Sequence, residues 1–340
     1  MSAGTPRASL RLRWTVLALV AVLALGGAAV YAIQAFQRYQ DRNHGTSAAS
    51  VTEQLPSEHR IVFRNTASGA GYGMVGAVSL EDPQGPRGLG TVPCDRVDAA
   101  DGLVSCMRTQ RGIPTTFDTK VLNAGGEEIA TWPLPGVPSR TRVSDDGLVA
   151  TTAFVTGHSY AGDSFSTETA VRSPDGRDYG NLEDFTMLVD GAKLAAIDRN
   201  VWGVSFAGGN DFYVTVASGG KTWLMRGSFS ARTLTSVKEN AECPSVSPDG
   251  QRIAYKKRRN EAGVVHWDIA VMTLSTKRET VIPLPSSLDD QLEWLDNGHL
   301  LYGVPRPGAV GDSDVFSIGA TAHARPKLLI EHAWSPSVER

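Results

Sequence analysis

Short stretches of alternating apolar and polar residues, separated by tight turns, recur along this chain. The clearest is 243–255, Cys-Pro-Ser-Val-Ser-Pro-Asp-Gly-Gln-Arg-Ile-Ala-Tyr. We expect two short strands here, because Pro248 fixes φ at one corner of the turn and Gly250 supplies a corner with positive φ. Four other units have the same layout, with turn glycines at Gly102, Gly147, Gly209 and Gly298.

The turn glycines lie 45, 62, 41 and 48 residues apart. A period in the forties, with about four short strands in each unit, is typical of a β-propeller. The segment 333–338 looks like the first strand of a unit, and 60–64 looks like a second strand with no first. Joined, they complete one composite blade and leave no open sheet edge. The sequence therefore predicts an all-β, six-bladed propeller over 60–338, with blades at 60–92 plus 332–338, 93–137, 138–198, 199–240, 241–288 and 289–331.

The unit 243–255 resembles the repeat of the TolB-like propeller family, in which an aliphatic strand follows a Ser-Pro-Asp-Gly turn. Trp334-Ser-Pro336 looks like the start of the same repeat. The resemblance implies the six-bladed fold and a non-catalytic binding role. TolB itself carries an α/β domain ahead of its propeller and partners a peptidoglycan-associated lipoprotein. Residues 43–59 are too few for such a domain, so the whole chain looks more like a membrane-anchored TolB-like protein.

An apolar, uncharged run at 14–33 precedes the repeats. Twenty residues of helix span about 30 Å, enough to cross a bilayer. Three arginines precede the run (Arg7, Arg11, Arg13) and two follow it (Arg38, Arg42), which favours a cytoplasmic N-terminus. We therefore expect a cytoplasmic segment at 1–13, an uncleaved signal-anchor at 14–33 and a stalk at 34–59, with the propeller outside the membrane. The rival interpretation is a signal peptide cleaved near 28–32, which would make the protein secreted.

Charge and cysteine content narrow the functional classes. Residues 43–340 carry 28 Lys and Arg against 35 Asp and Glu, a net charge of −7, which argues against nucleic acid as a partner.

A hairpin centred near residue 100 would bring Cys94 and Cys106 together, and an exported chain would oxidise them to a disulfide. Cys243 is expected to be a buried thiol. The basic run 256–259 is expected at a solvated strand end, with contact to anionic lipid or a cell-wall polymer as the alternative.

The long third unit contains an insertion, and insertions on a rigid scaffold commonly form binding surfaces. We take His158, Ser159, Tyr160 and Asp163 as candidates for ligand binding there. No Gly-x-Ser-x-Gly elbow is present, and no two histidines have ligand spacing on one element. No catalytic residue, metal site or cofactor is assigned.

The sequence thus favours a binding or scaffold module that uses a propeller face to contact an envelope protein or a cell-wall polymer. The alternative is a propeller hydrolase or lactonase with a metal or acidic site in the central channel. Residues at the starts of the blades are the expected channel liners: Asp95, Arg142, Trp202, Glu242 and Glu293.

Overall fold

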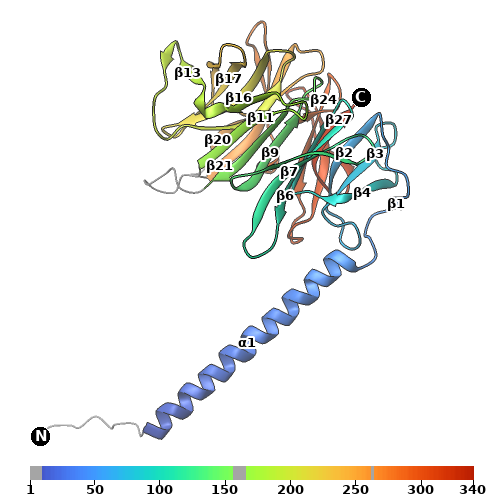
Figure 1. Cartoon of the computed structure of the whole chain (residues 1–340), viewed down its shortest axis with the longest axis vertical. Coiled ribbons are helices and arrows are strands. Elements are labelled where there is room, and N and C mark those ends of the chain that lie inside the picture. Colours follow the sequence, from blue (N-terminus) through green and yellow to red (C-terminus); the bar gives the residue numbers. More distant parts are fainter. Residues whose placement is uncertain (1–9, 156–165, 262–263) are drawn as a thin grey trace, which may run out of the picture.

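The computed structural model describes residues 10–155, 166–261 and 264–340 (Figure 1). It shows a six-bladed β-propeller with a single long N-terminal helix, α1 (Leu10–His44), that stands away from it as a stem. At 1.5 Å per residue, α1 is about 50 Å long. The expected fold is confirmed.

The first blade is composite and closes the ring. Strand β27 (Ala333–Glu339) is its innermost strand and pairs antiparallel with β2 (Arg60–Asn65), placing Ile61 opposite Val338. Strands β3 (Met74–Ser79) and β4 (Arg87–Pro93) follow outward. The short β1 (Val51–Thr52) adds to the outer edge in parallel with β4. Part of the 34–59 segment is therefore helical, and part is docked on this blade.

The second and third blades are four-stranded antiparallel sheets whose first strand is innermost. A 3-10 turn, η1, follows the third blade. Their elements in order are β5 (Arg96–Ala100), β6 (Leu103–Gln110), β7 (Thr116–Leu122), β8 (Glu128–Pro133), β9 (Val137–Val143), β10 (Val149–Val155), β11 (Ser166–Arg172), β12 (Asp178–Asn181) and η1 (Leu182–Asp184).

The fourth blade has six strands, because two short strands that precede it in sequence join its outer edge. These are β13 (Thr186–Val189) and β14 (Ala192–Lys193); the remaining strands, from the centre outward, are β15 (Asn200–Phe206), β16 (Asp211–Ser218), β17 (Lys221–Ser228) and β18 (Thr233–Glu239). The assignment of 182–197 to the third blade was wrong for β13 and β14. Strand β13 pairs in parallel with β18, with Met187 opposite Leu234, and both side chains are fully buried in one apolar cluster.

The fifth and sixth blades follow the simple four-stranded pattern. Their strands are β19 (Glu242–Val246), β20 (Arg252–Glu261), β21 (Val264–Thr273), β22 (Glu279–Ile282), β23 (Glu293–Trp294), β24 (His299–Pro305), β25 (Ser313–Gly319) and β26 (Lys327–Ile330).

Each pair of neighbouring blades shares one apolar cluster. Between the first and second blades, for example, Val62 packs with Val97 and Val104, and between the sixth and first blades Leu301 packs with Phe63. The other four junctions have equivalent clusters. The core is thus divided among the blade interfaces, and the inner strands are left to line a central channel.

The two faces of the propeller differ in what they carry. Neighbouring strands of a four-stranded blade run in opposite directions. The loops between second and third strands therefore lie on one side of the ring, and the turns between first and second strands and between third and fourth strands lie on the other. The stem α1 meets the β2–β3 loop: the Ala70 amide donates to the Gly45 carbonyl at 2.8 Å, and the Ala48 amide donates to the Ser68 carbonyl at 2.9 Å. We call this side the stem face and the opposite side, with the β7–β8 and β9–β10 turns, the far face.

Candidate functional site

A cavity of about 390 Å³ opens on the far face at the end of the central channel. The innermost strand of every blade contributes a polar side chain to its lining, and three of these six side chains are charged. These residues are Asp98, Arg142, Ser205, Ser245, Glu293 and Ser337. Polar side chains thus converge from all six blades at one end of the axis.

Arg142 on β9 organises the charges in this cavity. Its Nη1 lies 2.9 Å from Asp98 Oδ1 on the second blade and 2.5 Å from Glu293 Oε2 on the sixth. Its Nη2 donates to the Leu292 carbonyl. The other Asp98 oxygen accepts a hydrogen bond from the Val143 amide at 2.7 Å. All of these groups are largely buried, so one guanidinium holds three blades together in a low-dielectric environment.

The same network shifts the proton affinities of its members. Burial raises the pKa of Asp98 to about 6; the nearby Glu293 carboxylate adds to this, and the charge of Arg142 opposes it. Burial disfavours the charged form of Arg142, but the Glu293 and Asp98 carboxylates outweigh it and raise the pKa of Arg142. Arg142 is therefore a permanent cation at the centre of the cavity.

Tight turns between the first and second strands form the rim. In two of them a Ser hydroxyl donates to the Asp two residues later: Ser144 to Asp146 and Ser247 to Asp249, both at 2.6 Å. Gly147 and Gly250 then take positive φ, as the repeated Ser-x-Asp-Gly pattern predicts. These turns project polar side chains and exposed backbone around the opening.

Two of the five expected channel liners, Arg142 and Glu293, lie in this cavity. The other three lie elsewhere. Asp95 accepts from the Thr109 amide at 2.7 Å, Glu242 accepts from Trp267 Nε1 at 3.2 Å, and Trp202 is buried.

Sequence reasoning missed Asp98 and the three serines, although a signal was present. In each interior repeat the lining residue stands four or five positions before the turn glycine, as Asp98 does before Gly102 and Ser245 before Gly250. Aligning the repeats on their glycines would have placed these residues in one column.

The candidate residues of the insertion, His158, Ser159, Tyr160 and Asp163, lie outside the described residues. Within 10–155, 166–261 and 264–340, no group of three His, Cys, Asp or Glu side chains is arranged to hold a metal ion.

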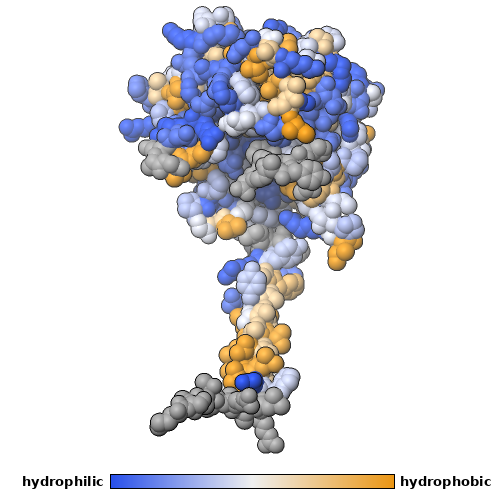
Figure 2. All heavy atoms as spheres, turned by 90° about the vertical axis from the view of Figure 1, so that its left-hand side faces the viewer, coloured by the Kyte–Doolittle hydropathy of each residue, from blue (hydrophilic) through white to orange (hydrophobic). Residues whose placement is uncertain are grey.

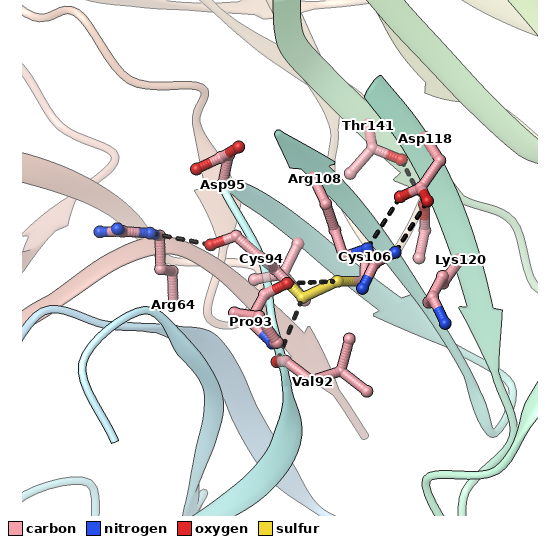
Figure 3. The surroundings of a disulfide bond; sticks show 12 residues. Arg64, Val92, Pro93, Cys94, Asp95, Cys106, Arg108, Asp118, Lys120 and Thr141 are labelled. Carbon is pink, nitrogen blue, oxygen red and sulfur yellow. Dashed lines mark hydrogen bonds and ion pairs between the residues drawn. A yellow bond between two sulfur atoms is a disulfide. The ribbon is translucent and has the colours of Figure 1, made fainter. Parts of the chain in front are cut away.

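A second cavity, of about 250 Å³, lies on the stem face between the first and second blades. Cys94 is in its wall, and the Cys94–Cys106 disulfide joins the segment before β5 to β6 with a Cα–Cα distance of 5.3 Å (Figure 3). The expected disulfide is confirmed. Arg64 and Arg108 lie on either side of it (Figure 3), and both line the cavity. Cys243 is buried, as expected.

Comparison with known proteins agrees with this architecture. TolB from Acinetobacter baumannii superposes with a TM-score of 0.58 at 16% sequence identity, over 83% of this chain and 67% of TolB. The chain is a six-bladed propeller similar in fold to TolB. A puromycin-hydrolysing peptidase from Mycobacterium tuberculosis gives a TM-score of 0.46 at 11% identity, over 86% of this chain and 48% of the peptidase. No protein-family model matches.

Sequence similarity extends to part of a peptidase. Dipeptidyl-peptidase 5 from Aspergillus oryzae is 30% identical over 151 residues, which is 42% of this TolB-like chain. The match spans only 20% of the length of that relative.

Proposed function

We propose that this protein is a non-catalytic binding or scaffold module, held at the outer surface of the cell membrane by α1, whose ligand is an envelope protein or a cell-wall polymer. The observation that carries the proposal is the far-face cavity, where polar side chains from six blades converge around one paired arginine. Its opening points away from the stem, toward where such a ligand would lie.

The anchor is supported by the surface of α1. Among the described residues, one helical segment, Leu12–Gln40, is long and apolar enough to span a membrane. Its large apolar side chains, such as Leu17 and Leu25, are exposed. Figure 2 shows an apolar stretch on the visible face of the stem, below a mostly polar head. A bilayer would cover this surface. The disulfide fits an oxidising compartment outside the membrane.

A mass measurement on the mature protein separates an anchor from a cleaved signal peptide. An anchored chain keeps its full mass of 36.3 kDa and resists carbonate extraction from membranes. A mature chain beginning near residue 33 would show that the protein is secreted instead.

Site-specific photo-crosslinking tests the binding face. A photoreactive residue placed at Asp145, which is exposed on the rim of the cavity, should capture a partner in native membranes. The matched control is Leu328, an exposed position on the outermost strand of the sixth blade. Capture of the same partner with equal yield at Leu328 would rule out the cavity as the binding face.

A hydrolase or lactonase remains the second candidate, because a buried carboxyl with a pKa near 6 suits general acid–base catalysis. Against it, both Asp98 oxygens are already engaged by Arg142 and the Val143 amide. Hydrolysis of lactone or peptide substrates that is abolished by Asp98→Asn would favour the enzyme over the scaffold.

A further inference from the structure

The cavity beside the disulfide lies at the foot of the stem. The β2–β3 loop lines it with Tyr72 and Gly73, and the same loop is hydrogen-bonded to the first residues after α1. The approach is close: a Cβ on Gly69, which has φ +97°, would lie 2.3 Å from the Thr46 carbonyl oxygen. The end of α1 and this cavity are therefore held together by short local contacts.

The cavity is lined by three arginines: Arg64, Arg108 and Arg111. Arg108 is neutralised, because its guanidinium lies 2.7 Å from Asp118 Oδ2. Arg64 and Arg111 form no ion pair with any carboxylate in the part of the chain that the structure describes. The one acidic lining residue, Asp95, is capped by the Thr109 amide. The cavity thus keeps an excess of positive charge on a domain whose net charge is negative.

Arg64 is held in position before any ligand arrives. Its Nε donates to the Cys94 carbonyl at 2.8 Å, next to the disulfide (Figure 3), and its guanidinium lies 5.0 Å from the centre of the Tyr72 ring. The Tyr72 hydroxyl in turn donates to the Gly311 carbonyl on the sixth blade at 3.0 Å. Such preorganisation reduces the entropy lost on binding.

An exposed apolar residue lies close by. The β6–β7 loop leaves the cavity wall at Gln110 and carries the exposed Arg111, followed by Ile113, whose side chain is fully open to solvent. A cationic pocket beside an exposed aliphatic tip matches the headgroup and the acyl boundary of a lipid bilayer.

We propose that this arginine cavity binds the phosphate of an anionic phospholipid headgroup and so seats the stem face of the propeller on the membrane. The proposal rests on the membrane placement of α1. It identifies a lipid ligand on the face opposite the far-face cavity, so the two sites can be occupied together.

Native mass spectrometry of the full chain, released from micelles with equal amounts of phosphatidylglycerol and phosphatidylcholine, tests it. Lipids that bind α1 through their acyl chains should be retained equally, whichever headgroup they carry. Enrichment of phosphatidylglycerol over phosphatidylcholine therefore reports headgroup binding in the cavity. We expect enrichment in the wild type and a loss of about fivefold in Arg111→Gln, because one arginine near a lipid surface contributes about that factor. Arg111 is exposed, so its replacement leaves the fold intact; Arg64→Gln should add a similar loss.

The matched control is Arg278→Gln, an exposed arginine in the β21–β22 turn on the far face, which should keep the full enrichment. Equal retention of both lipids by the wild type, or the same loss in Arg278→Gln, would overturn the proposal. Loss of the enrichment on addition of inorganic phosphate would show that the cavity takes a soluble anion and would also overturn it. Carbonate extraction tests the membrane anchor separately. If the chain stays in the membrane but shows no preference for phosphatidylglycerol, lipid binding by the cavity is refuted and the anchor stands. If the chain is released but still prefers phosphatidylglycerol, the anchor is refuted and lipid binding by the cavity stands.

Discussion

Arg142 on the third blade and Glu293 on the sixth meet across the central channel, with 2.5 Å between Nη1 and Oε2. These blades are opposite each other in a six-membered ring, so the pair spans the channel, and both residues line the far-face cavity. Arg142 also binds Asp98, and all three side chains are largely buried. The network therefore ties three blades of the ring together beside the far-face cavity.

Replacing Arg142 with Met should destabilise the fold by about 3–5 kcal/mol at pH 7, because two buried carboxylates lose their counter-ion. Chemical denaturation of the full chain in detergent measures the loss. The triple variant Arg142→Met, Asp98→Asn, Glu293→Gln should recover much of it, because the uncompensated charges are gone. A loss below about 1 kcal/mol for the single variant would show that water already screens these charges.

Closure of the ring depends on Arg60 and Glu339, at opposite ends of the propeller sequence. Arg60 Nε lies 2.6 Å from Glu339 Oε2, and the second Glu339 oxygen accepts from the Gly102 amide at 2.7 Å. Because Arg60 is only 1% exposed, Glu339→Ala would leave a buried cation without its partner. We expect a loss of about 3 kcal/mol or more in denaturant unfolding.

An exposed ion pair supplies the control for ring closure. Lys221 and Glu239 are 3.1 Å apart and more than half exposed, so Glu239→Ala should cost less than about 1 kcal/mol. Equal losses in the two variants would mean that the Arg60–Glu339 pair makes no special contribution to closure.

The fold was predictable because its signal is repeated and local. Each turn glycine marks one hairpin, and the strand-like ends at 60–64 and 333–338 indicated the composite blade. The pairing of β13 with β18 was not predictable, because a parallel contact between segments 47 residues apart, such as Thr186 and Thr233, leaves no periodic pattern. The convergence of Asp98, Arg142 and Glu293 likewise depends on the ring, which joins residues far apart in sequence.

The basic run 256–259 matches its prediction only in part. Strand alternation predicted a solvated strand end, and Arg258 is exposed, but β20 pairs with β21 throughout and encloses other side chains of the run. Lys256 is buried with its ammonium 5.0 Å from the centre of the Trp267 ring, and Arg259 pairs with Asp268 at 2.9 Å. Neighbouring strands supply these partners, and the run itself gives no sign of them.

The Cys94–Cys106 disulfide should stabilise the propeller by about 3 kcal/mol, since it closes a short loop in the unfolded chain. The double variant Cys94→Ala, Cys106→Ala measures this in denaturant, and dithiothreitol should lower the stability of the wild type but leave the variant unchanged.

Cys243 is 2% exposed, so it should react with maleimide only after unfolding. Rapid labelling of Cys243 in the native wild type would contradict the burial.

Glu183, in η1 between the third and fourth blades, should make stability depend on pH. Burial raises the pKa of Glu183 to about 7, although hydrogen bonds from the Thr167 hydroxyl and the Val201 amide oppose the shift. The unfolded value is about 4.3, so the folded state holds this proton more tightly. The stabilisation is complete below about pH 4 and is lost as the pH rises through 7.

Thermal unfolding of the full chain between pH 4.5 and pH 8 checks this. Glu183→Gln keeps the side chain neutral, so the variant should lose this part of the pH dependence and gain about 2–4 °C in Tm over the wild type at pH 8. The gain is modest because Glu183 is only half-buried and water screens its charge. The control is Asp184→Asn, the exposed neighbour in the same turn, which should follow the wild-type profile. Parallel profiles for the wild type and Glu183→Gln would show that Glu183 titrates as it does in the unfolded chain.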